Sequence, residues 1–169
     1  TRLGEALAGI KIANSKYAIS ESLLPGAAGG WWHKSGYTNQ MWCDGQYMGP
    51  ALLAQMLNEY DSYESDGCIA GSKEADWDLV TKQFTISWNY LWNPEVKLLY
   101  HAFTADPECT ADTNSKTNAS KWAGFPNSNG IYHSAEYWGR AEGWYFLALV
   151  DVLEQMQIAG LTKTENYKT

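Results

Sequence analysis

The feature that most constrains the fold is an apolar repeat of helical period at residues 46–60. Met48, Leu52 and Met56 recur at every fourth position, and a second apolar row runs beside them. Because polar residues are confined to a narrow arc, we expect a helix that is covered on most of its sides. Pro50 falls in the expected first turn, where proline is tolerated because its missing N–H would have had no partner.

One carboxylate, Asp44, stands at the start of this helix and can be read in two ways. As a helix cap it would accept hydrogen bonds from exposed backbone N–H groups, which is worth about 1 kcal/mol. As a functional group it would lie among the indole rings of Trp31, Trp32 and Trp42. Apolar surface opposes the ionisation of a carboxyl group, as a general acid requires, whereas a helix N-terminus favours it. The residue pattern leaves both interpretations open.

Four segments carry apolar residues at helical spacing: residues 2–14, 46–60, 75–92 and 139–157. The apolar face of the last of these consists of Phe146, Leu149, Val150, Leu153 and Met156. Residues 20–40 are rich in glycine and form a predicted long loop, and loops of this length in compact domains are usually functional. The apolar run 98–103 is predicted to be extended, and the polar stretch 104–136 is predicted to be mostly irregular.

Size and charge exclude several classes of protein. A chain of 169 residues can build one domain with a real core, so residues 1–169 are treated as a single domain. The net charge of −7 disfavours a nucleic-acid partner. No run approaches the roughly 20 apolar residues that span a membrane, so we expect no membrane partner. The N-terminus shows no signal-peptide pattern, and the cellular location stays open.

Neither the cysteines nor the histidines indicate a metal site. Three cysteines, Cys43, Cys68 and Cys109, are irregularly spaced and match neither a disulfide framework nor a zinc motif. A bridge between Cys68 and Cys109 stays open. The three histidines occur in three separate contexts without a paired spacing. We therefore expect neither a metal nor another cofactor.

The arginine at position 140 is one of only two in the chain and stands between Trp138 and Trp144. This setting suggests planar recognition of a carboxylate. The alternative is a surface ion pair with Glu136 or Glu142, although an arginine in a first helical turn opposes the helix dipole. Nine Trp and eleven Tyr suit a cleft for cyclic ligands, but aromatic cores are a commoner use of such residues.

Three other polar residues are ambiguous when taken alone. His101 follows an apolar run and would ordinarily be a hydrogen-bonded structural histidine. His33 and Lys34 stand in the glycine-rich loop and would ordinarily be solvated.

Three motifs that occur in a defined order along the chain favour a functional role for these residues. They are Gly29–Lys34 followed by Gln40–Met48, then Leu98–Phe103, then Tyr137–Tyr145. Together they resemble the unsaturated rhamnogalacturonyl and glucuronyl hydrolases, which form glycoside hydrolase family 105 and are related to family 88. The resemblance runs from about residue 29 to about residue 155, most of this chain but not a whole member of that family.

The fold implied by the resemblance is all-α, an (α/α)6 toroid of twelve helices in six hairpins with the active site at its wide end. Twelve helices of about 12 residues joined by loops of about 5 need roughly 200 residues. With four predicted helices in 169 residues, this chain is expected to be a central part of a longer toroid. The family's second aspartate, well upstream of the first motif, has no counterpart in residues 1–28.

The chemistry implied by the resemblance is hydration of a 4,5-unsaturated uronic acid on an anionic oligosaccharide left by a polysaccharide lyase. Asp44 matches the proton donor and water activator. The residues that match the lining of the sugar pocket are Arg140, His101, His33 and Lys34, with Met48, Trp138 and Trp144 as its apolar and stacking walls.

Two other functions stay open. An ordinary two-carboxylate glycosidase of the same shape would need a second acid within roughly 5–10 Å of Asp44, for which Glu136 and Glu142 are candidates. A non-catalytic sugar-binding scaffold would use Asp44 only as a helix cap. The uronic acid, the leaving sugar and the oligomeric state are not specified by these residues.

Overall fold

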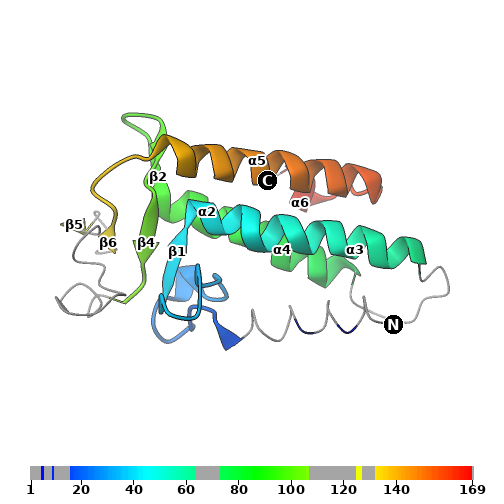
Figure 1. Cartoon of the computed structure of the whole chain (residues 1–169), viewed down its shortest axis with the longest axis horizontal. Coiled ribbons are helices and arrows are strands. Elements are labelled where there is room, and N and C mark those ends of the chain that lie inside the picture. The colour runs from blue at the N-terminus through cyan, green and yellow to red at the C-terminus, as the bar shows by residue number, and fades with distance from the viewer. Residues whose placement is uncertain are drawn as a thin grey trace.

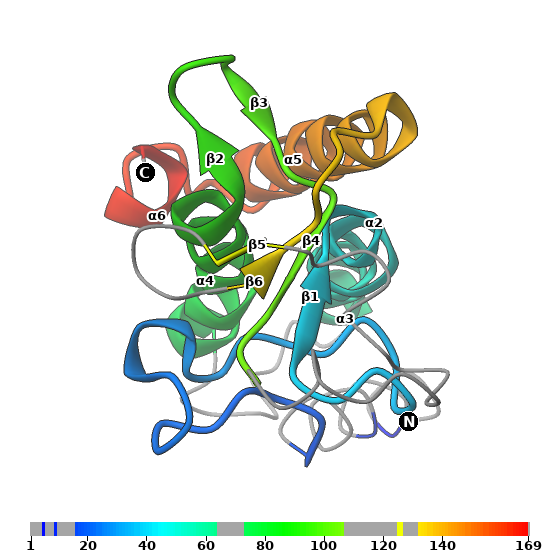
Figure 2. The same cartoon turned by 90° about the vertical axis from the view of Figure 1, so that its left-hand side faces the viewer.

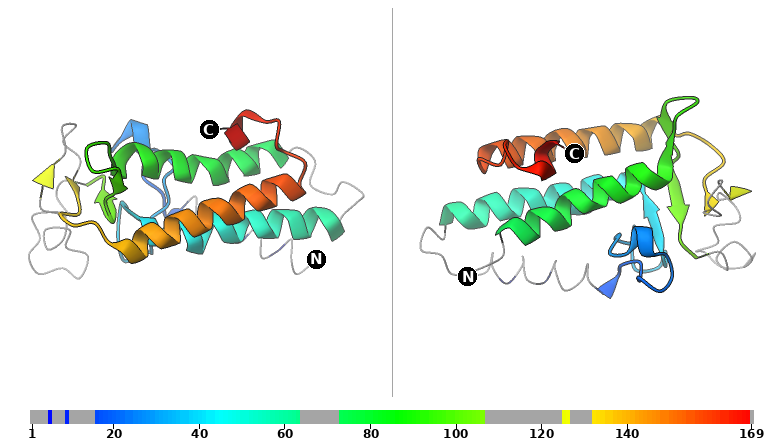
Figure 3. Two further views of the ribbon diagram at one scale, coloured as in Figure 1. Left: turned by 90° about the horizontal axis from the view of Figure 1, so that it is seen from above. Right: turned by 180° about the vertical axis from the view of Figure 1, so that it is seen from behind.

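The computed structural model describes residues 5, 9, 16–63, 73–106, 125–126 and 132–168. This part of the chain is mostly helical, with a few short strands. Three long helical rods lie lengthwise beside one another, and the strands gather at one end of them (Figure 1). The views from above and from behind show the same arrangement (Figure 3).

The first rod contains the predicted helix 46–60 but begins earlier. It consists of α2 (Cys43–Gln46), a π-helical turn η2 (Tyr47–Ala51) and α3 (Leu52–Tyr63) in direct succession. Pro50 therefore lies inside the rod and not in its first turn as expected. A proline has no N–H and clashes with the preceding turn, and a local π-helical turn is one way in which a helix absorbs such a residue.

Two further predicted helices are confirmed with nearly the expected bounds. They are α4 (Lys73–Leu91) and α5 (Gly139–Ile158). A short helix, α6 (Glu165–Lys168), follows α5 and was not predicted. The helix expected over residues 2–14 lies, but for two single residues, outside the described part of the chain.

The short strands form two antiparallel sheets. The larger sheet has the order β1-β4-β6-β5, and the smaller one pairs β2 with β3. Their bounds are β1 (Gln40–Trp42), β2 (Trp92–Asn93), β3 (Leu98–Leu99), β4 (Ala102–Thr104), β5 (Phe125–Pro126) and β6 (Tyr132–His133). Figure 2 views this end of the molecule, where β1, β4 and β6 lie side by side.

The extended segment predicted at residues 98–103 is confirmed as β3 and β4. Most of the stretch 104–136, which is predicted to be mostly irregular, lies outside the described residues. In its described part Thr104, β5 and β6 are paired strand residues, because strand formation depends on a pairing partner more than on local composition. The possible Cys68–Cys109 bridge lies outside the described residues, and Cys43 is a free, buried thiol.

The loop predicted at residues 20–40 is largely confirmed and contains one 3-10 turn, η1 (Pro25–Ala27). A single bridge joins Ala18 to Trp31 across it. The loop leads directly into β1.

The core lies between the three rods and continues under the sheet. Its largest fully buried side chains include Phe103, Ile19, Met41, Leu53, Leu91 and Met156. Helix α5 buries Ala141, Tyr145, Ala148, Val152 and Met156. Two residues of the apolar face that the sequence predicts for this helix, Phe146 and Val150, are exposed. The helix carries two apolar stripes, and the smaller residues of the buried stripe allow a close approach to the neighbouring rod.

Gly30 offers a direct test of this packing. A Cβ at Gly30 would overlap Sδ of the buried Met41 and lie 3.0 Å from the carbonyl oxygen of Ala27. We expect Gly30→Ala to lower the free energy of unfolding by about 1–3 kcal/mol through overpacking. Urea denaturation would measure the change.

The matched control is Gly143→Ala in the interior of α5, where an added Cβ meets nothing within 4 Å. Alanine in a helix interior should stabilise the protein by up to about 1 kcal/mol. A Gly30→Ala variant as stable as the parent chain would contradict the packing described here.

Candidate active site

The centre of the candidate site is a pair formed by Asp44 and His101. Oδ2 of Asp44 lies 2.9 Å from Nε2 of His101. The two side chains are 13% and 15% exposed, so the pair is largely shielded but still reachable. Asp44 lies in the first turn of α2, whereas the residue at the N-cap is Trp42, which makes no side-chain capping bond. Asp44 thus lies two residues after the N-cap position, so its carboxylate is not the N-cap of the helix. It contacts His101 instead.

Backbone pairing brings these two residues together across 57 positions of sequence. In the β1–β4 register Trp42 lies opposite Ala102. One step beyond the strands, the Cys43 N–H donates to the carbonyl oxygen of His101 at 2.9 Å. Asp44 follows Cys43 directly, so the sheet register sets the aspartate beside the histidine.

Aromatic rings enclose the imidazole of His101 from two sides. The ring of Trp42 meets it edge-on at a centroid distance of 4.9 Å, and the ring of Trp138 lies at 5.2 Å. Trp138 in turn carries Arg140, whose Cζ is 4.7 Å from the indole centroid. The guanidinium thus stands over an exposed indole at the start of α5, one ring away from the imidazole.

On the other side of Trp42 a second set of rings leads to Lys34. The rings of His33, Tyr37 and Trp42 are parallel to within 20°, with His33 and Trp42 centroids 4.7 Å apart. Nζ of Lys34 lies 3.9 Å from the Tyr37 ring. Ring contacts therefore connect both cations to the Asp44–His101 pair, Arg140 through Trp138 and Lys34 through Tyr37 and Trp42.

Burial lowers the pKa of His33, and the nearby charge of Asp44 opposes this shift. The dominant effect of burial favours a neutral imidazole at position 33.

Met48 and Trp144 complete the set of predicted site residues. Met48 is 57% exposed on η2 and lines a cavity of about 180 Å³ together with His33 and Trp42. Trp144 packs its ring against Tyr47 at 4.8 Å, which joins α5 to η2. The structure therefore connects His33, His101, Trp138 and Arg140 to Asp44 through ring contacts and charges, and it links Lys34 through Tyr37. The ring contact of Trp144 is with Tyr47.

Glu142 binds the backbone and is not directed at the Asp44 pair. Its Oε1 accepts the N–H of Leu99 in β3. Burial raises the pKa of Glu142, and the Leu99 hydrogen bond acts in the opposite direction. Glu136 is exposed, and its carbonyl oxygen accepts a bond from Ser134.

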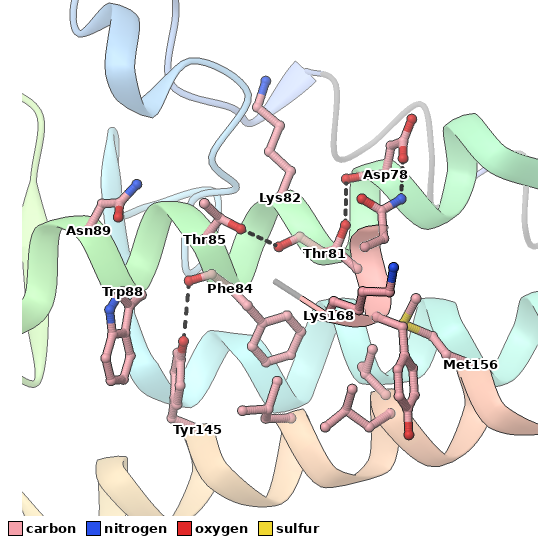
Figure 4. Close-up of a pocket in the computed structure, with 15 residues that line it drawn as sticks. Asp78, Thr81, Lys82, Phe84, Thr85, Trp88, Asn89, Tyr145, Met156 and Lys168 are labelled. Carbon is pink, nitrogen blue, oxygen red and sulfur yellow. Dashed lines mark hydrogen bonds between the residues drawn. The ribbon is translucent and has the colours of Figure 1, made fainter. Parts of the chain in front are cut away.

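A larger groove of about 720 Å³ lies between α4, α5 and α6 (Figure 4). Phe84 and Tyr145 lie on facing helices there, and the Tyr145 hydroxyl donates to the carbonyl oxygen of Phe84 at 3.2 Å. Among the described residues that line this groove, none was predicted for the site.

Among the described residues, no three histidine, cysteine, aspartate or glutamate residues are grouped so that they could hold a metal ion. No helix in the described ranges is long and apolar enough to cross a membrane.

Two residues of the site escaped prediction. Tyr37 stands between the two segments of the first motif, Gly29–Lys34 and Gln40–Met48, and had no assigned role. Ser134 bonds to the amide of His101 from a stretch that was expected to be irregular. Nothing in its local sequence marks it.

This chain is similar to known glycoside hydrolases. The family model of Glycosyl Hydrolase Family 88 matches residues 12–168. Among solved structures, a glycoside hydrolase from family 105 of C. acetobutylicum ATCC 824 is similar to this chain, with a TM-score of 0.52 and 29% sequence identity. The match covers 81% of this chain and 32% of that one, so the chain spans about a third of the solved structure that it resembles.

Proposed function

The chain belongs to Glycosyl Hydrolase Family 88, and on this premise we propose that it acts on a 4,5-unsaturated uronic acid at the non-reducing end of lyase-generated oligosaccharides. The uronic acid is galacturonyl or glucuronyl, as in the breakdown of rhamnogalacturonan and related pectins. The observation that carries the proposal is the Asp44–His101 pair, held 2.9 Å apart in a largely shielded aromatic setting.

The proposed chemistry is hydration of the vinyl-ether double bond. Asp44 delivers a proton to C4, and the oxygen of a water molecule adds at C5 while its proton passes to the carboxylate. The hemiketal formed in this way opens and releases the next sugar. One carboxyl group serves both proton transfers, so the second carboxylate of ordinary glycosidases is not required.

His101 orients the carboxyl group in this scheme. Its Nε2 engages Oδ2 of Asp44, which leaves Oδ1 for the substrate. Trp42 and Trp138 hold the imidazole by contact on two sides. A proton donor held in one orientation reacts faster because less orientational freedom must be lost in the transition state.

Arg140 is the proposed partner of the substrate carboxylate. A guanidinium offers a planar fork of donors that matches a carboxylate, and its position over Trp138 limits its motion. Trp138 is 48% exposed, so its free indole surface is available to the sugar ring. Lys34, Tyr37, His33 and Met48 are proposed to line the opposite wall, and Trp144 to support it from the second layer.

For the fold we propose that these helices are part of an (α/α)6 toroid. The similarity to a family 105 glycoside hydrolase at a TM-score of 0.52 supports this proposal. Helices α3 and α4 form an antiparallel hairpin, which is the repeating unit of such a toroid. The sheet end, where the Asp44 pair lies, would then be the face that binds substrate (Figure 2).

The proposed function is tested by incubating the protein with unsaturated galacturonyl and glucuronyl disaccharides and following the ultraviolet absorbance of the double bond. We expect the absorbance to fall and a free sugar to appear in equal amount. The matched control is the saturated disaccharide, which should not be cleaved. Cleavage of a saturated aryl glycoside would favour a two-carboxylate glycosidase, and binding without turnover of any substrate would favour a sugar-binding scaffold.

Replacement of Arg140 by lysine should weaken binding without loosening the fold. The positive charge remains, but the fork of donors is lost. A charge-assisted hydrogen bond is worth about 1.5–3 kcal/mol, so we expect KM to rise on the order of tenfold to a hundredfold. The melting temperature should hardly change, because Arg140 is exposed and its cation–π contact with Trp138 is worth about 0.5–1 kcal/mol, which lysine can partly keep.

The control for this variant is the reverse exchange, Lys163→Arg, at an exposed position after the far end of α5. It should leave KM unchanged. A large loss of thermal stability in Arg140→Lys with an unaltered KM would make Arg140 a structural brace.

A further inference from the structure

We propose that Ser134 is a positioning residue of this site, whose hydroxyl holds the backbone of His101 so that the imidazole meets Asp44. The role rests on the proposed function of the Asp44–His101 pair. In this role Ser134 acts only through His101.

Ser134 holds the segment around His101 at two successive residues. Its Oγ accepts the His101 N–H at 2.9 Å, and its own N–H donates to the carbonyl oxygen of Ala102 at 2.9 Å. The hydroxyl proton is also used, because Oγ donates to the carbonyl oxygen of Glu136 at 3.1 Å. Ser134 is only 4% exposed, so water cannot easily replace these bonds.

The sheet register explains why a side chain is needed here. In the β4–β6 ladder Phe103 lies opposite His133 and Thr104 opposite Tyr132. The Ser134–Ala102 bond extends this ladder by one step and ends it. Opposite pairs of an antiparallel ladder alternate between hydrogen-bonded and non-hydrogen-bonded, and Ala102–Ser134 is a hydrogen-bonded pair, so a further residue of β6 would offer no backbone acceptor to the His101 N–H. The serine hydroxyl supplies that acceptor instead.

The backbone carbonyl group of His101 is hydrogen-bonded to the segment that carries Asp44. The carbonyl oxygen of His101 accepts the Cys43 N–H at 2.9 Å. His101 is thus held between Cys43 on one side and Ser134 on the other. Loss of the serine hydroxyl frees one side, and the imidazole can then move relative to the carboxylate.

The experiment compares Ser134→Ala with Ser134→Thr in the full chain. Three properties are measured: kcat and KM on the unsaturated disaccharide, the ¹⁵N chemical shift of His101 Nε2, and the melting temperature. We expect Ser134→Ala to lower kcat by about tenfold to a hundredfold with KM nearly constant, because a small misplacement of a catalytic group has an effect of this size. The His101 resonance should move, and Ser134→Thr, which keeps the hydroxyl, should restore both kcat and the resonance.

The matched control is Ser87→Ala. Ser87 is fully buried in α4, and its hydroxyl accepts a hydrogen bond from Nε2 of Gln46 at 2.7 Å. Loss of the Ser87 hydroxyl therefore removes a comparable hydrogen bond without affecting the bonds of His101. It should lower the melting temperature alone. Should Ser134→Ala fail to fold, Ser134→Cys carries the same comparison, because a thiol is a much weaker acceptor than a hydroxyl.

The proposal is overturned if Ser134→Ala lowers only the melting temperature and leaves kcat and the His101 resonance as in the parent chain. It is also overturned if the folded threonine variant behaves like the alanine variant. If the parent chain itself hydrates no unsaturated substrate, the proposed function fails, whereas the His101 resonance still decides whether Ser134 positions the imidazole.

Discussion

Asp44→Asn is expected to reduce kcat on an unsaturated disaccharide by about two to four orders of magnitude, the usual contribution of a positioned acid or base. The amide has nearly the same shape as the carboxyl group, and its oxygen can still accept a hydrogen bond from Nε2 of His101. It cannot deliver a proton to the double bond or take one from water. Binding should therefore be largely preserved, with KM close to that of the parent chain.

The control is Asp151→Asn on α5, which lies 11 residues beyond Arg140 and thus about 16 Å further along the helix. This exchange alters the net charge equally and should leave kcat intact. If Asp44→Asn retained more than a tenth of the parent activity, Asp44 would not be the proton donor, and the site would need another acid.

Phe103→Ala is expected to have the largest effect on stability. Phe103 is fully buried on β4, where it lies between Met41 of β1 and His133 of β6 in the register. Its ring stacks on Tyr90 of α4 at 4.9 Å, so one side chain joins the sheet to the helices. Truncation should lower the free energy of unfolding by about 3–5 kcal/mol and the melting temperature by on the order of 10 °C.

The matched control is Phe146→Ala, the same exchange at an exposed position on α5. We expect a change of less than about 1 kcal/mol there. Thermal unfolding followed by circular dichroism compares the two variants directly. Equal losses of stability would mean that the sheet and the helices do not share the core described here.

Helical periodicity alone predicted the three long rods, because a helix that buries one face has apolar residues at every third or fourth position. The bounds of α4 and α5 agree closely with the predicted ranges. The first rod was misplaced at its start, where Pro50 was taken as a boundary signal. A π-helical turn accommodates that proline, and no local pattern distinguishes such a turn from a helix start.

The strands were harder to predict, because none of those in the described part of the chain is longer than three residues. So short a segment has no period of its own, and it becomes a strand only when a partner supplies its hydrogen bonds. The same limit applies to α5, whose two apolar stripes look alike in sequence. Only the packing of Tyr145 against α4 decides which stripe is buried.

The identities of the predicted site residues were readable from three motifs, since each motif keeps its residue types in a fixed local order. Their mutual placement was not. Asp44 meets His101 because β1 and β4 pair in one register, and a slip of one residue would turn the side chains to opposite faces. Ser134 bonds to His101 across 33 positions with no motif to mark it. Local sequence therefore determined which groups are available and which segments are helical, whereas the tertiary structure decided which of these groups touch, because contacts between distant segments depend on strand register and packing.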